Sequence, residues 1–249
     1  MTDRLAPSLD LDVSAGGFRI AGANSVPAGA GNGHTAAALG ALLQGVPGRS
    51  ANKVHAWLDA SAFYQAVVAL DTSVLTDAEI LERLDEYWAD IFGDTLGPLA
   101  VTYAIQRGGA SVVTGCCRES LAVALAEAAA ANGLALSRIG ARSSRVWRQC
   151  RRAVGRHASG CFAVVDEDAI SLGAWQDGRW VAWSNEGFAA QDWSGLRTCV
   201  QRFARLHALD DAVPVWTEVA GGRMREPAPA GFEHWTLLNA TGQPAEVLA

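Results

Sequence analysis

Two acidic residues at the ends of predicted strands are the positions in this chain best placed to do chemistry. Residues 9–21 read LDLDVSAGGFRIA, where a short apolar run ends near Asp12 and a second follows a small-residue turn. Backbone N–H groups of such a turn can cradle a phosphate, and a nearby carboxylate can hold Mg²⁺ through water. Asp12, Ser14, Gly16 and Gly17 are therefore candidates for a nucleotide-phosphate site. The plainer interpretation is a hairpin with a solvated aspartate.

A related pattern recurs at residues 161–183, CFAVVDEDAISLGAWQDGRWVAW, with Asp166 ending the first apolar run. If the two hairpins face each other, Asp166 meets Asp12 across a cleft and the pair could hold Mg²⁺ and ATP. The turn Asp166-Glu167-Asp168 lacks the glycines with which backbone amides approach a phosphate, and its three carboxylates repel a polyphosphate unless a metal intervenes. The alternative is a solvated acidic turn.

A cysteine pair offers a third kind of chemistry. Cys116-Cys117 follows Gly115 where a strand is predicted to lead into a helix, and a thiol at a helix N-terminus is acidic enough to be a nucleophile. None of the five histidines lies in a recognisable partner motif. The competing interpretation is a small buried cysteine.

Arginines form the one strong charge cluster, and Arg145, Arg148 and Arg152 share one face of a predicted helix. This stripe could meet anionic lipid or an acidic partner, or it could be a solvated face that pairs with the surplus acids. Of the nine tryptophans most should fill the core, but strand alternation beside the Asp177-Gly178 turn should turn one outward. We take Trp180 as that residue, a candidate partner anchor.

Composition bounds the elements that must position these residues. The 249 residues are half hydrophobic, enough for a sizeable core, and the net charge of −6 argues against a nucleic-acid binder. No apolar run approaches the ~20 residues of a membrane span, and the first residues show no apolar signal-peptide core. Five irregularly spaced cysteines suit a reducing compartment. We therefore expect a cytoplasmic protein.

Helical and strand patterns alternate along the chain, which predicts an α/β class with mixed sheets. A capping box at Thr76–Glu79 should open a helix with Ile80, Leu84, Trp88 and Ile91 on its buried face. A later helix should bury Leu196, Val200, Phe203 and Leu206. The helices are predicted at 34–44, 76–92, 118–131, 143–154 and 194–209, and the strands at 54–58, 63–70, 99–105, 110–114, 161–183 and 213–219. After Gly221 we expect an irregular tail.

The ordered series of these segments resembles the PilM family of type IV pilus assembly proteins and, more distantly, the cytoplasmic part of GspL-type secretion proteins. The resemblance runs from about residue 9 to about residue 183. LDLDVSAGGFRIA is similar to the family's opening strand-loop-strand, LTDAEILERLDEYWADIFG to a helix entry with Glu79 at its acidic position, and FAVVDEDAISLGAWQDGRWVAW to the second hairpin. The resemblance implies an actin-like (ribonuclease H-like) α/β fold with mixed sheets flanked by helices.

Departures from the family pattern imply a reduced member. The family's Asp-x-Gly is here Asp12-Val13-Ser14, the second loop lacks glycine, and the region after Trp183 is short. We expect a first lobe at 1–158 with an inserted subdomain at about 50–140, a truncated second lobe at 159–222 and a tail at 223–249.

The resemblance implies a non-catalytic scaffold without a cofactor, cytoplasmic and peripheral to the inner membrane, in a type IV pilus or type II secretion-like platform. Its expected partner is the cytoplasmic N-terminal segment of a bitopic inner-membrane protein similar to PilN. The alternative is an ATP-binding enzyme or switch of the same fold, which uses Asp12 and Asp166 with Mg²⁺.

Overall fold

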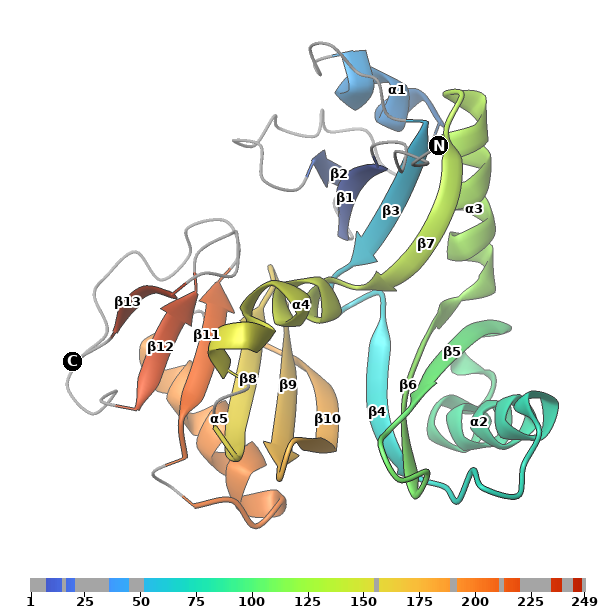
Figure 1. Cartoon of the computed structure of the whole chain (residues 1–249). Coiled ribbons are helices and arrows are strands. Elements are labelled where there is room, and N and C mark those ends of the chain that lie inside the picture. Colours follow the sequence, from blue (N-terminus) through green and yellow to red (C-terminus); the bar gives the residue numbers. More distant parts are fainter. Residues whose placement is uncertain are drawn as a thin grey trace, which may run out of the picture.

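Three sheets and five α-helices make up the described part of the chain in this computed structural model (Figure 1). The structure describes residues 8–14, 17–20, 36–44, 52–154, 157–188, 192–210, 213–219, 234–238 and 244–247. The strand orders are β2-β1-β3-β7, β4-β6-β5 and β10-β9-β8-β11-β12-β13.

The first sheet belongs to the first lobe. β1 (Ser8–Ser14) pairs antiparallel with β2 (Gly17–Ile20) and parallel with β3 (Lys53–Leu58), and β7 (Ala135–Ala141) extends the sheet in parallel. Helices α1 (Ala36–Gln44) and α3 (Glu119–Ala131) bury their apolar side chains against it in one core. Helix α4 (Arg142–Val154) follows β7 and lies between this sheet and that of the second lobe (Figure 1).

A three-stranded sheet forms an inserted subdomain between β3 and α3. It contains β4 (Tyr64–Ala69), β5 (Leu99–Ile105) and β6 (Ser111–Arg118). Helix α2 (Asp77–Phe92) covers the sheet, and the short 3₁₀ helix η1 (Gly93–Thr95) follows α2 in the chain. The predicted capping box at Thr76 is confirmed, as is the burial of Ile80, Leu84 and Trp88. The prediction for Ile91 is wrong: it is 50% exposed, because Phe92 takes the last inward position and stacks on Trp88.

The second lobe repeats the strand order of the first. β8 (Ser159–Val165) pairs antiparallel with β9 (Ala169–Gln176) and parallel with β11 (Val215–Val219), as β1 does with β2 and β3. β10 (Arg179–Gly187) joins β9 through the predicted turn, where Asp177 and Gly178 have φ of 51° and 73°. Helix α5 (Trp193–Leu206) packs on this sheet, but Leu206 is 72% exposed rather than buried, since it lies in the last turn.

The prediction of an irregular tail after Gly221 is wrong, because this region contains two further strands. β12 (Trp235–Leu238) pairs in parallel with β11, and β13 (Pro244–Val247) pairs antiparallel with β12. The short apolar run around Trp235 can form a strand because a sheet edge is available to it. That edge is a tertiary feature which local sequence does not report.

Candidate functional site

Four carboxylates gather at the carboxyl ends of the matching strands of the two lobes. Asp12 lies in the buried part of β1 near its end and Asp166 follows β8, while Asp59 follows β3 and Glu218 lies near the end of β11. Their exposed fractions are 3–7%. In open α/β sheets ligands bind in the crevice beyond the carboxyl ends of the strands, so this is where a nucleotide site belongs.

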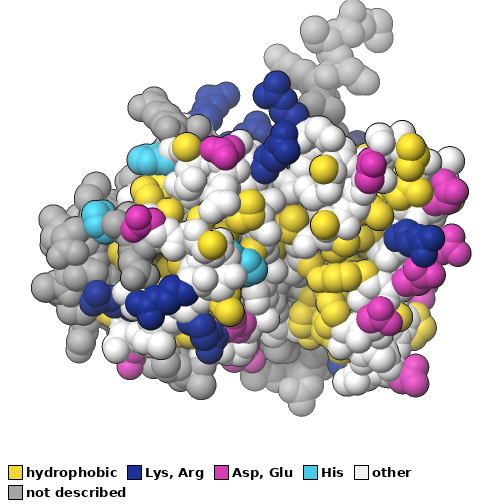
Figure 2. All heavy atoms as spheres, turned by 90° about the horizontal axis from the view of Figure 1, so that it is seen from below, with side chains coloured by type: hydrophobic (Ala, Val, Ile, Leu, Met, Phe, Trp, Pro, Cys, Tyr) yellow, Lys and Arg dark blue, Asp and Glu magenta, His cyan; other side chains and the backbone are white. Residues whose placement is uncertain are grey.

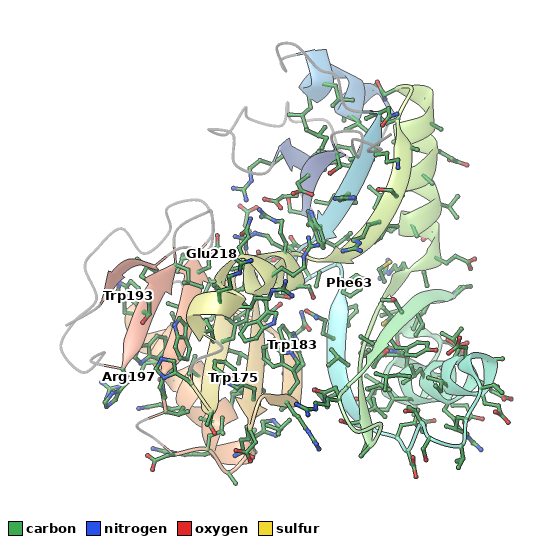
Figure 3. The ribbon with its side chains drawn as sticks, in the orientation of Figure 1. Phe63, Trp175, Trp183, Trp193, Arg197 and Glu218 are labelled. Atoms are coloured by element: carbon green, nitrogen blue, oxygen red, sulfur yellow. The ribbon has the colours of Figure 1, made fainter. Side chains whose placement is uncertain are left out.

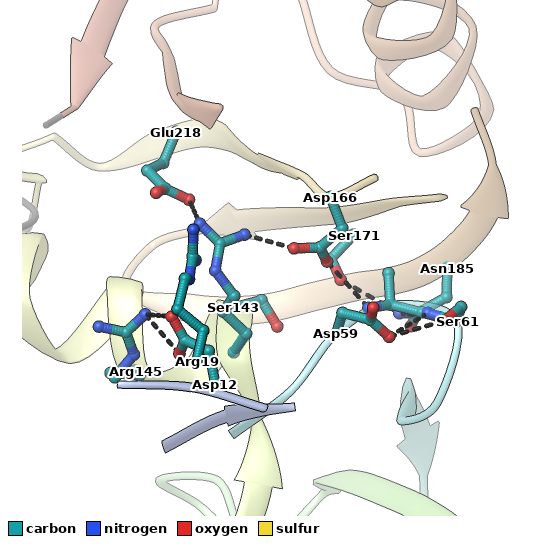
Figure 4. A network of polar contacts seen from close by, with 12 residues as sticks. Asp12, Arg19, Asp59, Ser61, Ser143, Arg145, Asp166, Ser171, Asn185 and Glu218 are labelled. Carbon is teal, nitrogen blue, oxygen red and sulfur yellow. Dashed lines mark hydrogen bonds and ion pairs between the residues drawn. The ribbon is translucent and has the colours of Figure 1, made fainter. Parts of the chain in front are cut away.

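Arg142, the first residue of α4, joins two of these carboxylates within the second lobe. Its two terminal nitrogens donate to Asp166 and to Glu218, respectively, and all three side chains are almost fully buried (Figure 4). Asp166 also accepts a hydrogen bond of 2.8 Å from the backbone N–H of Ala60, which comes from the first lobe. One guanidinium therefore bridges adjacent strands and fixes the carboxylate that reaches across to the other lobe.

Arg145, one turn further along α4, neutralises Asp12 of the first lobe. Its Nη2 lies 2.8 Å and 3.0 Å from the two oxygens of Asp12. Arg19, directly opposite Asp12 in the β1–β2 ladder, donates a second hydrogen bond of 3.0 Å. Asp12 is thus held by two guanidinium groups, one from its own hairpin and one from α4.

The pKa values of these groups depend on burial and on whether a carboxylate has an arginine partner. Burial raises the pKa values of Asp166 and Glu218, and the positive charge of Arg142 opposes the rise. Burial by itself lowers the pKa of Arg142, but the charges of Glu218 and Asp166 outweigh burial, so the pKa is raised. Asp59 forms no ion pair with an arginine of the described residues. Burial raises its pKa to about 6, hydrogen bonds from Ser61 oppose the rise, and the charge of Asp166 adds to it.

Amide side chains tie the inserted subdomain to the second lobe beside these ion pairs. Asn185 in β10 donates to the backbone oxygens of Ala60 and Phe63 and accepts from the N–H of Gln65. Gln106 both donates to and accepts from the backbone of Trp180, at 2.8 Å each way. Figure 3 shows Phe63 and Trp183 on the facing elements of this junction. The two sides are therefore held by directional bonds.

The predicted cofactor residues are brought together only in part. The charge of Asp12 acts on Asp166, so the two carboxylates lie near each other, but both are buried and neither is a solvated turn residue. Glu167 and Asp168 are exposed, so the solvated-turn interpretation holds for them alone. Ser14 and Gly17 flank the first turn, with Gly17 at φ 127°, and Gly16 lies outside the described residues.

The residues present do not fit a nucleotide with Mg²⁺. A water-bridged Mg²⁺ needs carboxylate oxygens that are free to accept from its water, whereas Asp12 and Asp166 already hold buried guanidinium groups. To admit the metal, Arg142 or Arg145 would have to leave its buried partners, which is costly. Within the described residues, no group of three or more His, Cys, Asp and Glu side chains is arranged to hold a metal.

The predicted arginine patch is wrong for Arg145, and for Arg148 and Arg152 it stays a prediction. Arg145 is 5% exposed and belongs to the cleft, because the first turn of α4 enters between the lobes. Arg148 and Arg152 are exposed on the outer side of the helix. Trp180 is half-buried in a layer with Trp147, Trp175 and Trp183, so it is not a freely projecting anchor.

The cysteine nucleophile is contradicted by the structure. Cys116 and Cys117 lie inside β6 rather than at a helix N-terminus, because the strand runs on to Arg118. Burial raises the pKa of Cys116 to about 12 and that of Cys117 to about 11. Both thiols stay protonated at neutral pH, so neither is an activated nucleophile.

Glu218 and the bridging role of Arg142 were missed from the sequence. The signal for Glu218 was present: it is the one charged residue in the apolar segment VPVWTEV, and a charge in a buried strand needs a partner. The signal for Arg142 was hidden, because seven arginines lie between 138 and 156 and nothing local distinguishes the first turn of α4.

The two lobes and their sheets form an actin-like fold. No known family matches the sequence, and neither does any curated protein. Among solved structures, the chain is similar to a "PilM-PilN type IV pilus biogenesis complex" (TM-score 0.68, 11% identity), which covers 94% of this chain and 88% of that one.

Two further solved structures share the fold. The cytoplasmic domain of EpsL, an inner membrane component of the type II secretion system of Vibrio cholerae, has a TM-score of 0.56 and 13% identity over 97% of this chain and 90% of that one. A Bacteroides thetaiotaomicron protein with an actin-like ATPase fold has a TM-score of 0.55 and 12% identity over 86% of this chain and 81% of that one. None of the described helices is long and apolar enough to cross a membrane.

Proposed function

We propose that the chain is a non-catalytic cytoplasmic scaffold of a type IV pilus or type II secretion-like assembly platform. It binds the cytoplasmic N-terminal segment of an inner-membrane partner similar to PilN. The observation that carries the proposal is the buried ion-pair cluster, in which Arg142 and Arg145 hold the carboxylates that an ATPase of this fold would offer to Mg²⁺. The likeness to PilM in its complex with PilN supports the choice of partner.

The inserted subdomain offers a place for such a segment. β5 is the outer strand of its sheet, so one side of its backbone is available to pair with an added strand. Beside it, a shallow cavity of about 390 Å³ lies between α3 and the chain before β5, with Leu96, Pro98 and the half-exposed Val123 as apolar contacts. Glu119 and Glu127 line the same cavity, and cytoplasmic segments next to membrane spans are rich in Lys and Arg.

A point substitution in this groove tests the proposal. Inner-membrane proteins are captured from detergent extract on the immobilised chain, and the bound segment is mapped by limited proteolysis. Val123→Arg should reduce capture of that segment at least tenfold, because it places a charge in the apolar floor. Val74→Arg is the matched control: Val74 is 80% exposed and lies outside the groove, so this variant should capture as the wild type does.

The ATP alternative is tested in parallel by thermal unfolding with Mg·ATP. A ligand that binds only the folded state must raise its stability. We expect no shift of the unfolding midpoint at millimolar nucleotide. A saturable shift that disappears in Asp12→Asn would replace the scaffold with a nucleotide-dependent switch.

A further inference from the structure

The outer side of α4 and the neighbouring end of β7 carry arginines of a different kind from those in the cleft. Arg138, Arg148, Arg151 and Arg152 are all exposed, and we call this surface the arginine face. None of the four forms an ion pair with any carboxylate in the described part of the chain. The chain as a whole has a net charge of −6, so these four cations form a positive patch on an otherwise negative protein.

Arg148 lies within the electrostatic range of Arg138 and Arg151. The pKa of Arg148 is lowered first by burial and then by the positive charges of Arg138, Arg145 and Arg151. Asp10 attracts Arg148, but the same carboxylate already bonds the rings of His55 and Trp57. Arg148 is held in place by the indole of Trp57, whose ring centre lies 4.6 Å from its guanidinium carbon. The surface is thus electropositive and partly pre-organised.

Among the described residues, the arginine face has no exposed large hydrophobic side chain that could anchor a protein partner. Val146, Cys150 and Val154 of α4 point into the core, and Trp147 packs against it. The described large hydrophobic residues that are exposed lie on other elements: Val74, Leu81, Ile91, Ile105, Val123, Val181 and Leu206. Hydrophobic side chains also gather on the face seen in Figure 2. Protein interfaces are depleted of charge at their centre, whereas anionic headgroups need only a field of positive charge.

We infer that the arginine face binds the anionic headgroups of a lipid bilayer and so orients the chain on the membrane that holds its partner. This inference rests on the proposed function for the identity of the membrane, but the binding itself requires no partner. Guanidinium groups pair with phosphate oxygens through two parallel hydrogen bonds. This favours direct pairing with phospholipid headgroups over a long-range electrostatic attraction alone. Each arginine removed should weaken binding about fivefold.

Vesicle co-sedimentation of the full chain tests the inference. The vesicles contain phosphatidylglycerol and phosphatidylcholine, or phosphatidylcholine alone. The wild type should bind the first and not the second, with affinity falling as salt rises. The triple variant Arg148→Gln, Arg151→Gln, Arg152→Gln should lose about a hundredfold in affinity.

A second triple variant is the matched control. Arg197→Gln, Arg202→Gln, Arg205→Gln makes the same change of net charge on α5, where Arg202 already pairs with Glu186. This control should bind vesicles as the wild type does, and unchanged unfolding midpoints will show that both variants fold. Equal losses in the two triples, or no binding of the wild type to anionic vesicles, would overturn the inference.

Two further measurements separate the alternatives. If a polyglutamate peptide binds the wild type more tightly than the vesicles do and loses affinity in the α4 triple, the surface serves an acidic protein and the lipid assignment is wrong. In detergent, the α4 triple should still capture the inner-membrane segment, because that groove lies on α3 and β5. Loss of capture in Val123→Arg with intact vesicle binding leaves this inference standing, and failure of the wild type to capture any such segment removes the proposed function alone.

Discussion

Helix α4 presents two sets of arginines that differ in everything except residue type. Arg142 and Arg145 in its first turn are buried and share three carboxylates from β1, β8 and β11. Arg148, Arg151 and Arg152, one to two turns later, are exposed and have no ion-pair partner among the described carboxylates. The first set closes a cleft from within, and the second set leaves positive charge available to another molecule.

The contrast shows how buried carboxylates between the two lobes can be neutralised by side chains of the protein itself. A nucleotide with Mg²⁺ would bring positive metal to the carboxylates and join the two lobes. Here the guanidinium groups of α4 neutralise the same carboxylates, and the Ala60 N–H bonded to Asp166 joins the lobes. Buried charges of this kind contribute little net stability when paired but cost a great deal when one partner is removed. Substitutions that remove one partner of a buried pair should therefore destabilise the protein more than removal of the whole pair does.

The largest effect is expected from Arg142→Met. The substitution leaves Asp166 and Glu218 buried without their cation, which should lower the free energy of unfolding by about 3–5 kcal/mol. Both carboxyls will then bind protons more readily in the folded state than in the unfolded state, so the loss should be greater at pH 8 than at pH 5. Urea unfolding at the two pH values measures this.

The rescue experiment for Arg142 is a neutral triple variant. Arg142→Met with Asp166→Asn and Glu218→Gln removes all the buried charge at once, and most of the lost stability should return. If the single substitution costs less than about 1 kcal/mol, Arg142 is not the cation that closes the cleft.

Arg145→Met should have a smaller effect of the same sign. Asp12 keeps the hydrogen bond from Arg19, so its charge is not left alone. We expect a loss of about 2 kcal/mol, measured by the same urea titration. Adding Arg19→Met should then cost more than it does in the wild type, because the second substitution strips the last cation from Asp12.

Asp59 lies in the cleft without an arginine partner, and its pH dependence should show it. Its pKa is raised to about 6, so between about pH 4 and pH 6 the folded state holds a proton that the unfolded state has released. The wild type therefore loses stability as pH rises through this window. Asp59→Asn should remove the part of this slope that comes from Asp59. The variant should be more stable at pH 8 by about 1–2 kcal/mol, a value reduced from the full pKa shift for solvent screening.

Asp71 is the matched control for Asp59. Asp71 and Ser73 form the same Asp-x-Ser turn on the surface, where hydrogen bonds from Ser73 lower the pKa of Asp71. Stability from this group is present above its unfolded pKa and is lost as pH falls, so Asp71→Asn should change the pH profile in the opposite sense. The same direction in both variants would mean that burial does not set the pKa of Asp59.

The sequence predicted the local elements well because their signals are local. The capping box at Thr76 and the Asp177-Gly178 turn each need only a few neighbouring residues. The depth of a side chain is set by other segments: Arg145 was placed with Arg148 by helical spacing, and only the docking of α4 between two sheets separates them. β12 was missed for the same reason, since it forms only because the edge of β11 is open to it, and the residues of β12 themselves do not report that edge.

The smallest effects should come from single substitutions on the arginine face. Arg148→Gln loses its contact over the ring of Trp57, worth about 0.5–1 kcal/mol. It also relieves repulsion from Arg138 and Arg151, which partly offsets that loss. Arg152→Gln has no such contact and should stay within about 0.5 kcal/mol of the wild type. Because repulsion between exposed charges is screened, added salt should stabilise the wild type slightly more than Arg148→Gln. A loss for Arg152→Gln as large as that for Arg145→Met would show that the two sets of arginines are not distinct.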